Sequence, residues 1–477
     1  MRHDETRYCL LMKGRLCGLL FVCALSCTKT NPDATCPDGT CSDPAHPYCD
    51  FDGAISGTAG VCISVSCTPG AVKECSGSDQ ALTCTANGSD YELDDCTLGC
   101  AIGPSPHCML LQPKYVPNIC ATPATDAQLA FGSGSGSSFF DPNVDANCNG
   151  GILPQAGTGE LCVVHYGTIS IGSDAALTIL GCAGSDCDAV GSARAIALVA
   201  DDALSVDGEI DVNGHMGVNG PGGGAIMSGG VKQFNDGSND ASSGGGGAGG
   251  ATAGAPGGDG TTNGTGTTGG GAPGGDAMSS PSALDVLVGG ASSYREVGVV
   301  GGDTNFGGGG GALTLISCRG TVSVSGTIDA GGGGGAGGWA FIGIPVPGWG
   351  GGAGGTVVIQ AARVVITGSL FANGGAGGGG GQSNETALLD DGGQDGSLSD
   401  SMPAYGTSAY GAGAGGNGGF IGGLPTPGSA PTGSGAAGGG GGSVGFLQVY
   451  TTVDGTPTIT PVQVSPAFQP NGTVETQ

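Results

Sequence analysis

An eleven-residue pattern of alternating apolar and polar residues occurs three times in this chain, at 204–214, 322–332 and 364–374. In each copy apolar residues stand at positions 1, 3, 7 and 9, and glycine stands at positions 5 and 11. Alternation with a period of two is typical of a β-strand with one buried face. Each copy therefore predicts two short strands joined at a glycine bend.

A further short alternating run precedes each copy, at 196–198, 313–315 and 357–359, so the repeating unit contains three short strands. An eroded unit at 163–179 and a degenerate unit at 446–459 flank the three clear ones. Helix signals are nearly absent.

The identical spacing of the copies indicates how the strands are buried. In a parallel β-helix each unit stacks on the next, and equivalent apolar residues form ladders. A β-sandwich would use the same runs as antiparallel pairs. We expect an all-β chain whose residues 151–477 form a parallel β-helix or solenoid-like domain with long glycine-rich loops, with the sandwich as the alternative.

Glycine tracts follow the repeats and account for much of the 107 glycines in 477 residues. A glycine run has no side chain to bury and loses much entropy on ordering, which is typical of flexible linkers. The tracts recur at the same point of each unit, however, so they could also pack as a bundle of polyglycine-type helices. Both interpretations remain open at this stage.

Residues 27–120 are rich in cysteine and poor in apolar residues, so cross-links must supply their stability. One predicted module holds Cys36, Cys41, Cys49 and Cys62, and a second holds the six cysteines between 67 and 108. The sequence does not choose among the pairings. No C-x-x-C occurs, which disfavours zinc ribbons and redox motifs. Residues 121–150 are predicted to be a Ser/Gly-rich connector.

The amino-terminal residues 1–26 have the features of a signal peptide of the lipoprotein type, with Met12 as an alternative start. Basic residues precede a short apolar run, and a small residue precedes Cys27, the predicted site of lipidation. An ordinary secretory signal or an uncleaved anchor are the alternatives. The expected location is the cell surface or outer membrane of a bacterium, outside the cytoplasm, or else secretion.

The net charge of −28 bears on the partners of the protein. An acidic field repels phosphate backbones, so nucleic acid is not expected as a partner. We expect a membrane partner through the lipid anchor, together with extracellular polysaccharide or other surface proteins.

The cysteine-rich module that includes residues 47–50, the segment 197–214 and the polyglycine loops together resemble the large surface lipoproteins predicted in myxobacteria. This resemblance implies an exported surface protein and carries no activity onto particular residues. At the level of fold, the repeats also resemble β-helical adhesins and polysaccharide-active enzymes.

Two segments are candidates for ligand binding. Asp141, Asn143 and Asp145 place oxygen atoms at alternate positions, as a calcium loop requires, although the segment lacks the glycine and the final acid of an EF-hand. Trp339, Phe341 and Trp349 form an apolar island between glycine tracts, suited to stacking on sugar rings. The alternatives are a turn-rich connector for the first segment, and a loop folded back over the sheet for the second.

No catalytic residues are predicted. The G-x-S-x-G pattern around Ser443 lacks the helix that a nucleophile elbow needs. The adjacent Asp201 and Asp202 stand at a bend, and His165 and His215 are isolated in the sequence. We therefore expect a non-enzymatic surface protein with a structural or adhesive role and no required cofactor. A polysaccharide lyase or hydrolase is the alternative.

Overall fold

The computed structural model describes most of the chain from Cys36 to residue 476. The described residues are 36, 41–43, 46, 48–50, 58–64, 67, 68, 70–85, 88, 90–103, 105–132, 136–156, 159–183, 194–224, 243–261, 268, 269, 271–278, 286–293, 306–341, 344–382, 392–408, 411–433, 435–453 and 455–476. The predicted signal peptide, Met12 and Cys27 lie outside them. Within the described residues, no helix has the length and apolar character needed to cross a bilayer.

The described chain is built almost entirely of strands and extended segments. Its described residues divide into two compact units, one drawn from 1–74 and 82–94 and the other from 75–81 and 95–477. The early strands are short: β1 (Tyr48–Asp50), β2 (Val61–Ile63), β3 (Val72–Cys75), β4 (Gln80–Cys84), β5 (Tyr91–Asp95), β6 (Cys100–Ala101), β7 (His107–Cys108) and β8 (Leu111–Gln112). The 3-10 helices η2 (Ile119–Ala121) and η3 (Asp145–Asn147) follow.

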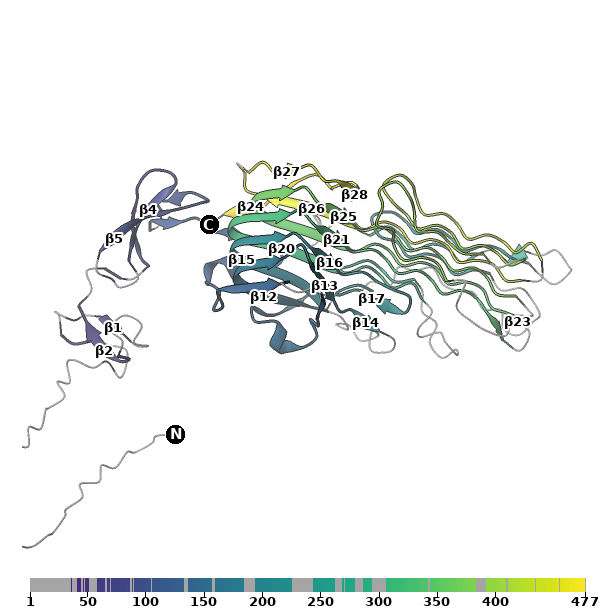
Figure 1. Ribbon diagram of the computed structural model, residues 1–477, viewed down its shortest axis with the longest axis horizontal. Coiled ribbons are helices and arrows are strands. Elements are labelled where there is room, and N and C mark those ends of the chain that lie inside the picture. The colour runs from purple at the N-terminus through teal and green to yellow at the C-terminus, as the bar shows by residue number, and fades with distance from the viewer. Residues whose placement is uncertain are drawn as a thin grey trace, which may run out of the picture. The chain divides into compact units, whose positions relative to one another are not determined.

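Two sheets dominate the second unit (Figure 1). The larger, nine-stranded sheet contains β9 (Gln128–Phe131), β11 (Gly151–Gln155), β12 (Gly159–Ile171), β15 (Ala195–Val206), β20 (Ala312–Val324), β24 (Thr356–Ile366), β26 (Phe446–Thr451), β27 (Thr458–Ile459) and β29 (Gly472–Thr473). The smaller, six-stranded sheet contains β10 (Gly136–Phe140), β13 (Ala175–Ile179), β16 (Glu209–Asp211), β21 (Thr327–Asp329), β25 (Ser369–Phe371) and β28 (Gln463–Ser465).

Each repeat unit gives one long strand to the larger sheet and one short strand to the smaller sheet. The first two predicted strands of a unit are joined into one long strand, which bends at a register shift, as between Ala200 and Leu204 of β15. Position 5 of the pattern, glycine at 208, 326 and 368, stands between the long and the short strand. A side chain on Gly326 would overlap the carbonyl oxygen of Gly208 in the preceding unit, so the corner admits glycine alone.

The predicted apolar ladders are confirmed. Leu204, Val322 and Val364 are register partners in the larger sheet, and Ile210, Ile328 and Leu370 are register partners in the smaller sheet. These side chains are fully buried in one core to which both sheets contribute. A second apolar cluster includes Leu161, Val163 and Ile316 of the larger sheet and Tyr115 and Val116 of the segment that follows β8. Burial of apolar surface along both clusters is the main force that holds the sheets.

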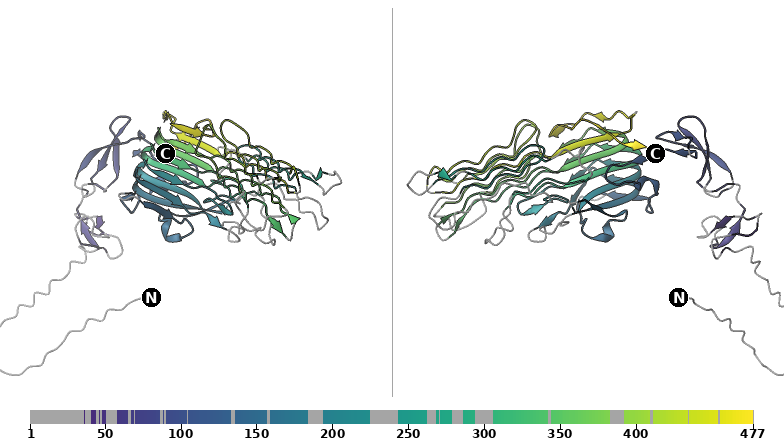
Figure 2. Two further views of the ribbon diagram at one scale, coloured as in Figure 1. Left: turned by 45° about the vertical axis from the view of Figure 1, so that its right-hand side comes forward. Right: turned by 180° about the vertical axis from the view of Figure 1, so that it is seen from behind.

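The predicted β-helix is wrong. Its coils would each need a third strand that returns the chain to the next coil, but after the short strand the chain leaves the sheets for a glycine tract. The parallel sheets therefore lie as two layers and not as a clear β-helix (Figure 2). The antiparallel sandwich is not found either, because all pairs in these two sheets except β11 with β12 are parallel.

The reason for this error is that alternation reports which residues are buried, and not how the chain closes. A strand with one buried face satisfies the same pattern in a closed coil, a sandwich or an open pair of layers. Here the returning segments are glycine tracts, which carry no alternating pattern that could have shown their path.

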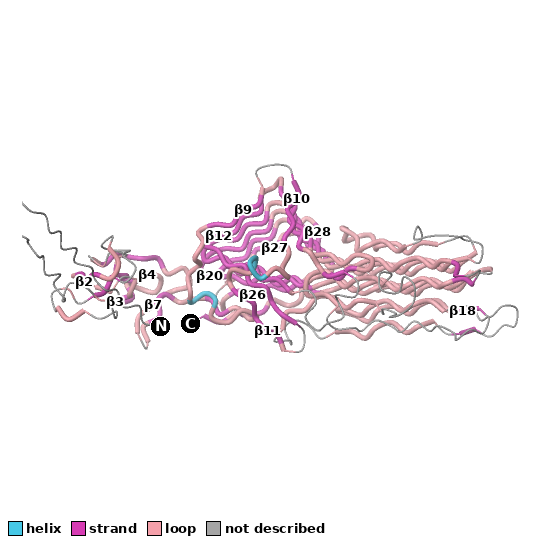
Figure 3. The backbone as a smooth tube through the Cα atoms, turned by 90° about the horizontal axis from the view of Figure 1, so that it is seen from below, coloured by secondary structure: helices cyan, strands magenta, loops and turns pink. Residues whose placement is uncertain are grey.

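The glycine tracts pack side by side as a bundle. We call the described parts of 212–224, 243–311, 330–355 and 372–445 the glycine bundle. Figure 3 shows these segments as loops that run alongside one another away from the sheets. Three further pairs of small strands are β14 (Cys182–Ala183) with β17 (Val218–Asn219), β18 (Gly260–Thr261) with β19 (Thr268–Gly269), and β22 (Ala340–Phe341) with β23 (Ile344–Pro345). The last strand, β30 (Glu475–Thr476), pairs with β8.

Backbone hydrogen bonds in the bundle repeat every three residues. The amides of Gly348, Gly351 and Gly354 donate to the carbonyls of residues 437, 440 and 443 of one neighbouring segment. The amides of Trp349, Gly352 and Gly355 donate to residues 336, 333 and 330 of another. A three-residue turn without internal hydrogen bonds is the geometry of a polyproline II-type helix. The polyglycine-bundle interpretation is therefore confirmed for these segments.

Disulfides join seven pairs of described cysteines. The pairs are Cys36–Cys49, Cys41–Cys62, Cys67–Cys84, Cys75–Cys100, Cys96–Cys108, Cys120–Cys318 and Cys148–Cys162. The first five stay within the two predicted groups of cysteines. Cys120–Cys318 spans 198 residues of sequence and fastens the segment after β8 to strand β20. These cross-links are consistent with an extracytoplasmic protein.

Candidate functional site

The most unusual titratable group stands where the smaller sheet meets the glycine bundle. Asp329 ends β21, and its register partner in β16 is Asp211. Asp329 is only 3% exposed. Its two carboxylate oxygens accept hydrogen bonds from the Asn213 side chain at 2.5 Å and the Gly331 amide at 3.0 Å. The site is thus a buried carboxylate held by two donors beside a second carboxylate.

The charge state of Asp329 follows from this environment. Burial, which penalises the charged form, raises the pKa of Asp329 to about 7. The hydrogen bond from Asn213 opposes this rise, whereas the neighbouring Asp211 adds to it. Asp329 therefore exchanges a proton near neutral pH.

A histidine–carboxylate pair lies in the adjoining part of the bundle. His215 Nδ1 stands 2.7 Å from an Asp395 oxygen, and the other Asp395 oxygen accepts from the Gly334 amide at 2.7 Å. The hydrogen bond with Asp395 raises the pKa of His215, against the effect of burial. Both side chains are about half exposed. His215, isolated in the sequence, is therefore paired across 180 residues.

The polar contacts continue along the same edge through the next units. Asn213 also accepts from the Gly331 amide at 2.5 Å. At the same position of the third copy, Asn373 donates to the carbonyls of Ser397 and Ser399 and accepts from the Ser465 hydroxyl. Asparagine at position 10 of the pattern therefore joins the sheet to the bundle. Its recurrence at 213 and 373 is the signal that could have indicated this role.

A second buried pair lies in the larger sheet. His165 Nε2 stands 2.8 Å from an Asp201 oxygen, and both side chains are nearly fully buried. The other Asp201 oxygen accepts from the Ala124 amide at 2.8 Å and lies 3.8 Å from Arg319. Asp202 lies 3.6 Å from the same guanidinium. Asp201 thus binds the backbone at Ala124, and both carboxylates lie near Arg319. The two side chains do not face each other as a carboxylate pair.

One group of potential metal ligands accompanies this pair. A sulfur of Cys318 lies within 4.8 Å of ligand atoms of His165 and Asp201. Cys318 is joined to Cys120, however, and a disulfide sulfur does not offer the thiolate that zinc binds. His165 and Asp201 therefore lie beside the Cys120–Cys318 disulfide.

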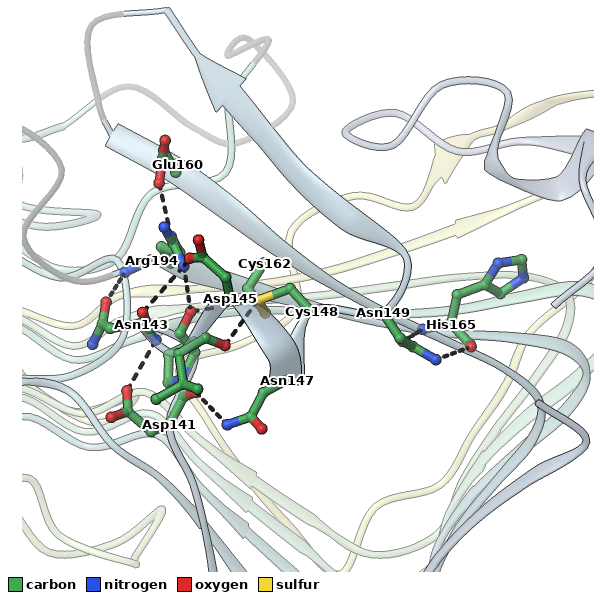
Figure 4. The surroundings of a disulfide bond; sticks show 12 residues. Asp141, Asn143, Asp145, Asn147, Cys148, Asn149, Glu160, Cys162, His165 and Arg194 are labelled. Atoms are coloured by element: carbon green, nitrogen blue, oxygen red, sulfur yellow. Dashed lines mark hydrogen bonds and ion pairs between the residues drawn. A yellow bond between two sulfur atoms is a disulfide. The ribbon is translucent and has the colours of Figure 1, made fainter. Parts of the chain in front are cut away.

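The predicted calcium loop surrounds an arginine instead (Figure 4). Arg194 contacts Asp145 at 2.6 Å and Glu160 at 2.7 Å, and it donates to the carbonyls of Pro142 and Asn143. Asp141 accepts from the Asn143 amide at 2.9 Å, which closes a local turn. The guanidinium thus supplies positive charge to Asp145 and to the Asn143 carbonyl, where a calcium ion would need oxygen ligands. Sequence reasoning missed Arg194, because it comes from a distant part of the chain.

The loop is also fastened from its other end. Cys148 is joined to Cys162 of β12, and Asn149 exchanges two hydrogen bonds of 2.8 Å with the backbone of His165 (Figure 4). The segment 121–150, predicted as a Ser/Gly-rich connector, therefore contributes β9 and β10 to the sheets and a cross-linked turn.

The two tryptophans of the chain lie against each other. Their ring centroids are 4.9 Å apart and the ring planes are inclined by 12°. Trp349 is buried with Ala336 and Val346, whereas Trp339 is half-buried. Phe341 belongs to β22, and its side chain lies outside the described residues. The island thus folds back on itself but leaves part of one indole at the surface.

Ser443, the centre of the nucleophile-like pattern, is fully buried in the glycine bundle. Its hydroxyl donates to the carbonyl of Val444 at 3.2 Å. No described helix follows it, so the geometry of a nucleophile elbow is not present.

Comparisons with models of protein families, with curated proteins and with solved structures found no match to this chain.

Proposed function

We propose that this protein is an exported, lipid-anchored protein of the bacterial cell surface with a structural or adhesive role. The lipid anchor would be attached at Cys27, and the ligands would be extracellular glycans or other surface molecules. The disulfides support an extracytoplasmic location, because such cross-links persist in oxidising compartments.

The glycine bundle is the observation that carries this proposal. Its segments bond to one another through the backbone at regular intervals and extend away from the sheets (Figure 1). Residues 401–445, which form a large part of it, contain no Asp, Glu, Lys, Arg or His. A projection whose segment 401–445 carries none of these ionisable side chains is suited to presenting a surface, and this segment has little with which to catalyse a reaction.

A polysaccharide lyase or hydrolase is the competing function, and the pair Asp211 and Asp329 favours it. Glycoside hydrolysis commonly uses two carboxylates with different proton affinities. Asp329 holds its proton near neutral pH and has a carboxylate as its register neighbour. Both Asp329 oxygens already accept hydrogen bonds from the protein, which suits a structural carboxylate better than a catalytic one.

Two measurements test the proposal. Full-length protein expressed in a bacterium that processes lipoproteins should incorporate labelled palmitate and partition with membranes, and the variant Cys27→Ala should do neither. External protease should cleave the anchored protein on intact cells. Retention of the label by Cys27→Ala, or protection of the protein inside intact cells, would refute the anchored surface location.

The enzymatic alternative is tested separately with a panel of polysaccharides. We expect no release of reducing or unsaturated ends. Release by the wild-type chain that disappears in Asp329→Asn and Asp211→Asn would establish the enzyme instead.

A further inference from the structure

We propose that the stacked pair Trp339 and Trp349 is a binding platform for the face of an uncharged sugar ring in a polysaccharide. This inference rests on the adhesive function proposed above and adds to it a site and a class of ligand.

The indole of Trp339 has one face covered and part of its surface open. The parallel arrangement with Trp349, at 12° and 4.9 Å, covers one face of the ring. Trp339 as a whole remains half-buried, so the stacking does not enclose the residue. An open indole face is a flat apolar surface that matches the C–H groups on one side of a pyranose ring, and aromatic residues of this kind dominate binding energies.

Trp349 holds the platform in place. It is 1% exposed and packs with Ala336 and Val346. Its amide donates to the Ala336 carbonyl at 3.0 Å, so its backbone belongs to the hydrogen-bonded bundle. Trp349 is therefore a positioning residue that fixes the orientation of the Trp339 ring.

The backbone around Trp339 is restrained as well. The Trp339 carbonyl accepts from the Val346 amide at 2.6 Å, and the Gly338 amide donates to Gly379 at 2.8 Å. Strands β22 and β23 pair in antiparallel fashion. A platform that is ordered before binding loses little conformational entropy when the ligand arrives, which favours affinity.

The position of the pair suits contact with a large ligand. Figure 1 shows β23, which follows Trp339, at the end of the glycine bundle that is farthest from the two sheets. A polymer chain can approach this end without meeting the sheets. The two tryptophans flank the short strands β22 and β23, in a part of the chain that is otherwise mainly glycine.

Charge selects the class of polysaccharide. Arg363 is the single charged residue between positions 331 and 382, and it lies in β24 of the larger sheet. The pair therefore has no nearby cation in this stretch to hold a uronate or sulfate group, and the net charge of −28 opposes anionic polymers. The ligand expected is a neutral glycan that binds by stacking and by hydrogen bonds to the backbone.

The test uses the full-length protein, released from the membrane with detergent, and soluble oligosaccharides as probes. The neutral probes are cello-, malto- and N-acetylated chito-oligosaccharides, and polygalacturonate is the anionic probe. Binding to at least one neutral probe should change the tryptophan fluorescence, with no binding to polygalacturonate. Trp339→Ala should weaken the binding about tenfold or more, and Trp339→Phe, which keeps a ring, should recover part of it.

The matched control is Tyr405→Ala, which removes another aromatic side chain of the bundle that is 47% exposed. It should bind like the wild type, and thermal unfolding should confirm that all variants are folded. Equal binding by Trp339→Ala and the wild type would overturn the proposal, as would binding of polygalacturonate alone or of none of the probes. In those cases the lipid label and surface protease results would still decide the proposed function independently.

Discussion

Asp211 and Asp329 occupy the same position of the repeated pattern and are register partners in adjacent parallel strands. Like charges at such close positions are unfavourable, and Asp329 is also buried. In the third copy the corresponding residue is Phe371, so the carboxylate pair is formed by the first two copies of the pattern.

The pH dependence of stability should report this pair. The pKa of Asp329 is raised from 3.8 to about 7 in the folded protein, so the folded state binds the proton more tightly than the unfolded state. Its contribution to stability is complete below about pH 4 and is lost as the pH rises through 7. The variant Asp329→Asn stays uncharged at every pH, so it does not lose this contribution. Denaturant unfolding should show that the stability of Asp329→Asn relative to the wild type is about 2–4 kcal/mol greater at pH 8 than at pH 5.

The comparison with Asp211→Asn separates burial from repulsion. Removal of Asp211 eliminates the neighbouring charge but leaves Asp329 buried, so the pH dependence should become smaller without disappearing. If the difference in unfolding free energy between the wild type and Asp329→Asn does not change with pH, the raised pKa of Asp329 is contradicted.

A methyl group within the glycine bundle should be costly. A Cβ on Gly351 would overlap the carbonyl oxygen of Gly375, whereas a Cβ on Gly433 would meet its nearest atom at 3.4 Å, an ordinary contact. Gly351→Ala should therefore lower the melting temperature and increase hydrogen exchange in the bundle. The control Gly433→Ala should be neutral or stabilising by up to about 1 kcal/mol, through the unfolded state. Equal effects of the two variants would show that close packing does not require glycine here.

The long-range disulfide should stabilise the sheets most. Cys120–Cys318 closes a separation of 198 residues, and cross-links between distant residues restrict the unfolded chain more strongly. The double variant Cys120→Ala/Cys318→Ala should lose about 2–5 kcal/mol in guanidinium unfolding. The control pair Cys36→Ala/Cys49→Ala, separated by 13 residues in the other unit, should leave the unfolding of the sheets unchanged.

Calcium should have little effect while Arg194 is present. The guanidinium contacts Asp145 and Glu160 and donates to two carbonyls of the same loop, so a calcium ion would have to displace it. We expect millimolar calcium to leave both the melting temperature and the protease sensitivity of 141–150 unchanged. Arg194→Gln tests the loop without the cation. A calcium-dependent rise in the melting temperature of the wild type would instead establish the calcium site predicted from Asp141, Asn143 and Asp145.

Much of the core could be predicted from the sequence. The buried positions of the pattern, such as Leu204, Ile210 and Ile328, follow from alternation, because a strand turns successive side chains to opposite faces. Glycine at position 5 could be placed at the corner for the same local reason. The grouping of the cysteines between 36 and 108 followed from their proximity along the chain.

The candidate sites depended on contacts that no local pattern records. Asp395 reaches His215 across 180 residues, and Arg194 reaches Asp145 across 49. The partners in each pair come from different parts of the chain, so no repeated sequence spacing relates them. The open arrangement of the two sheets was missed because alternation shows which face of a strand is buried, and not what covers that face.

The sequence by itself determined the strands, their buried faces and the glycine corners, because these depend on the period of neighbouring residues and on the volume of one side chain. The tertiary structure alone decided that the glycine tracts pack as a bundle, that Asp211 stands beside Asp329, and that Trp339 rests on Trp349. Those relationships depend on which segments come together in space, where backbone hydrogen bonds and burial, rather than sequence spacing, determine the neighbours.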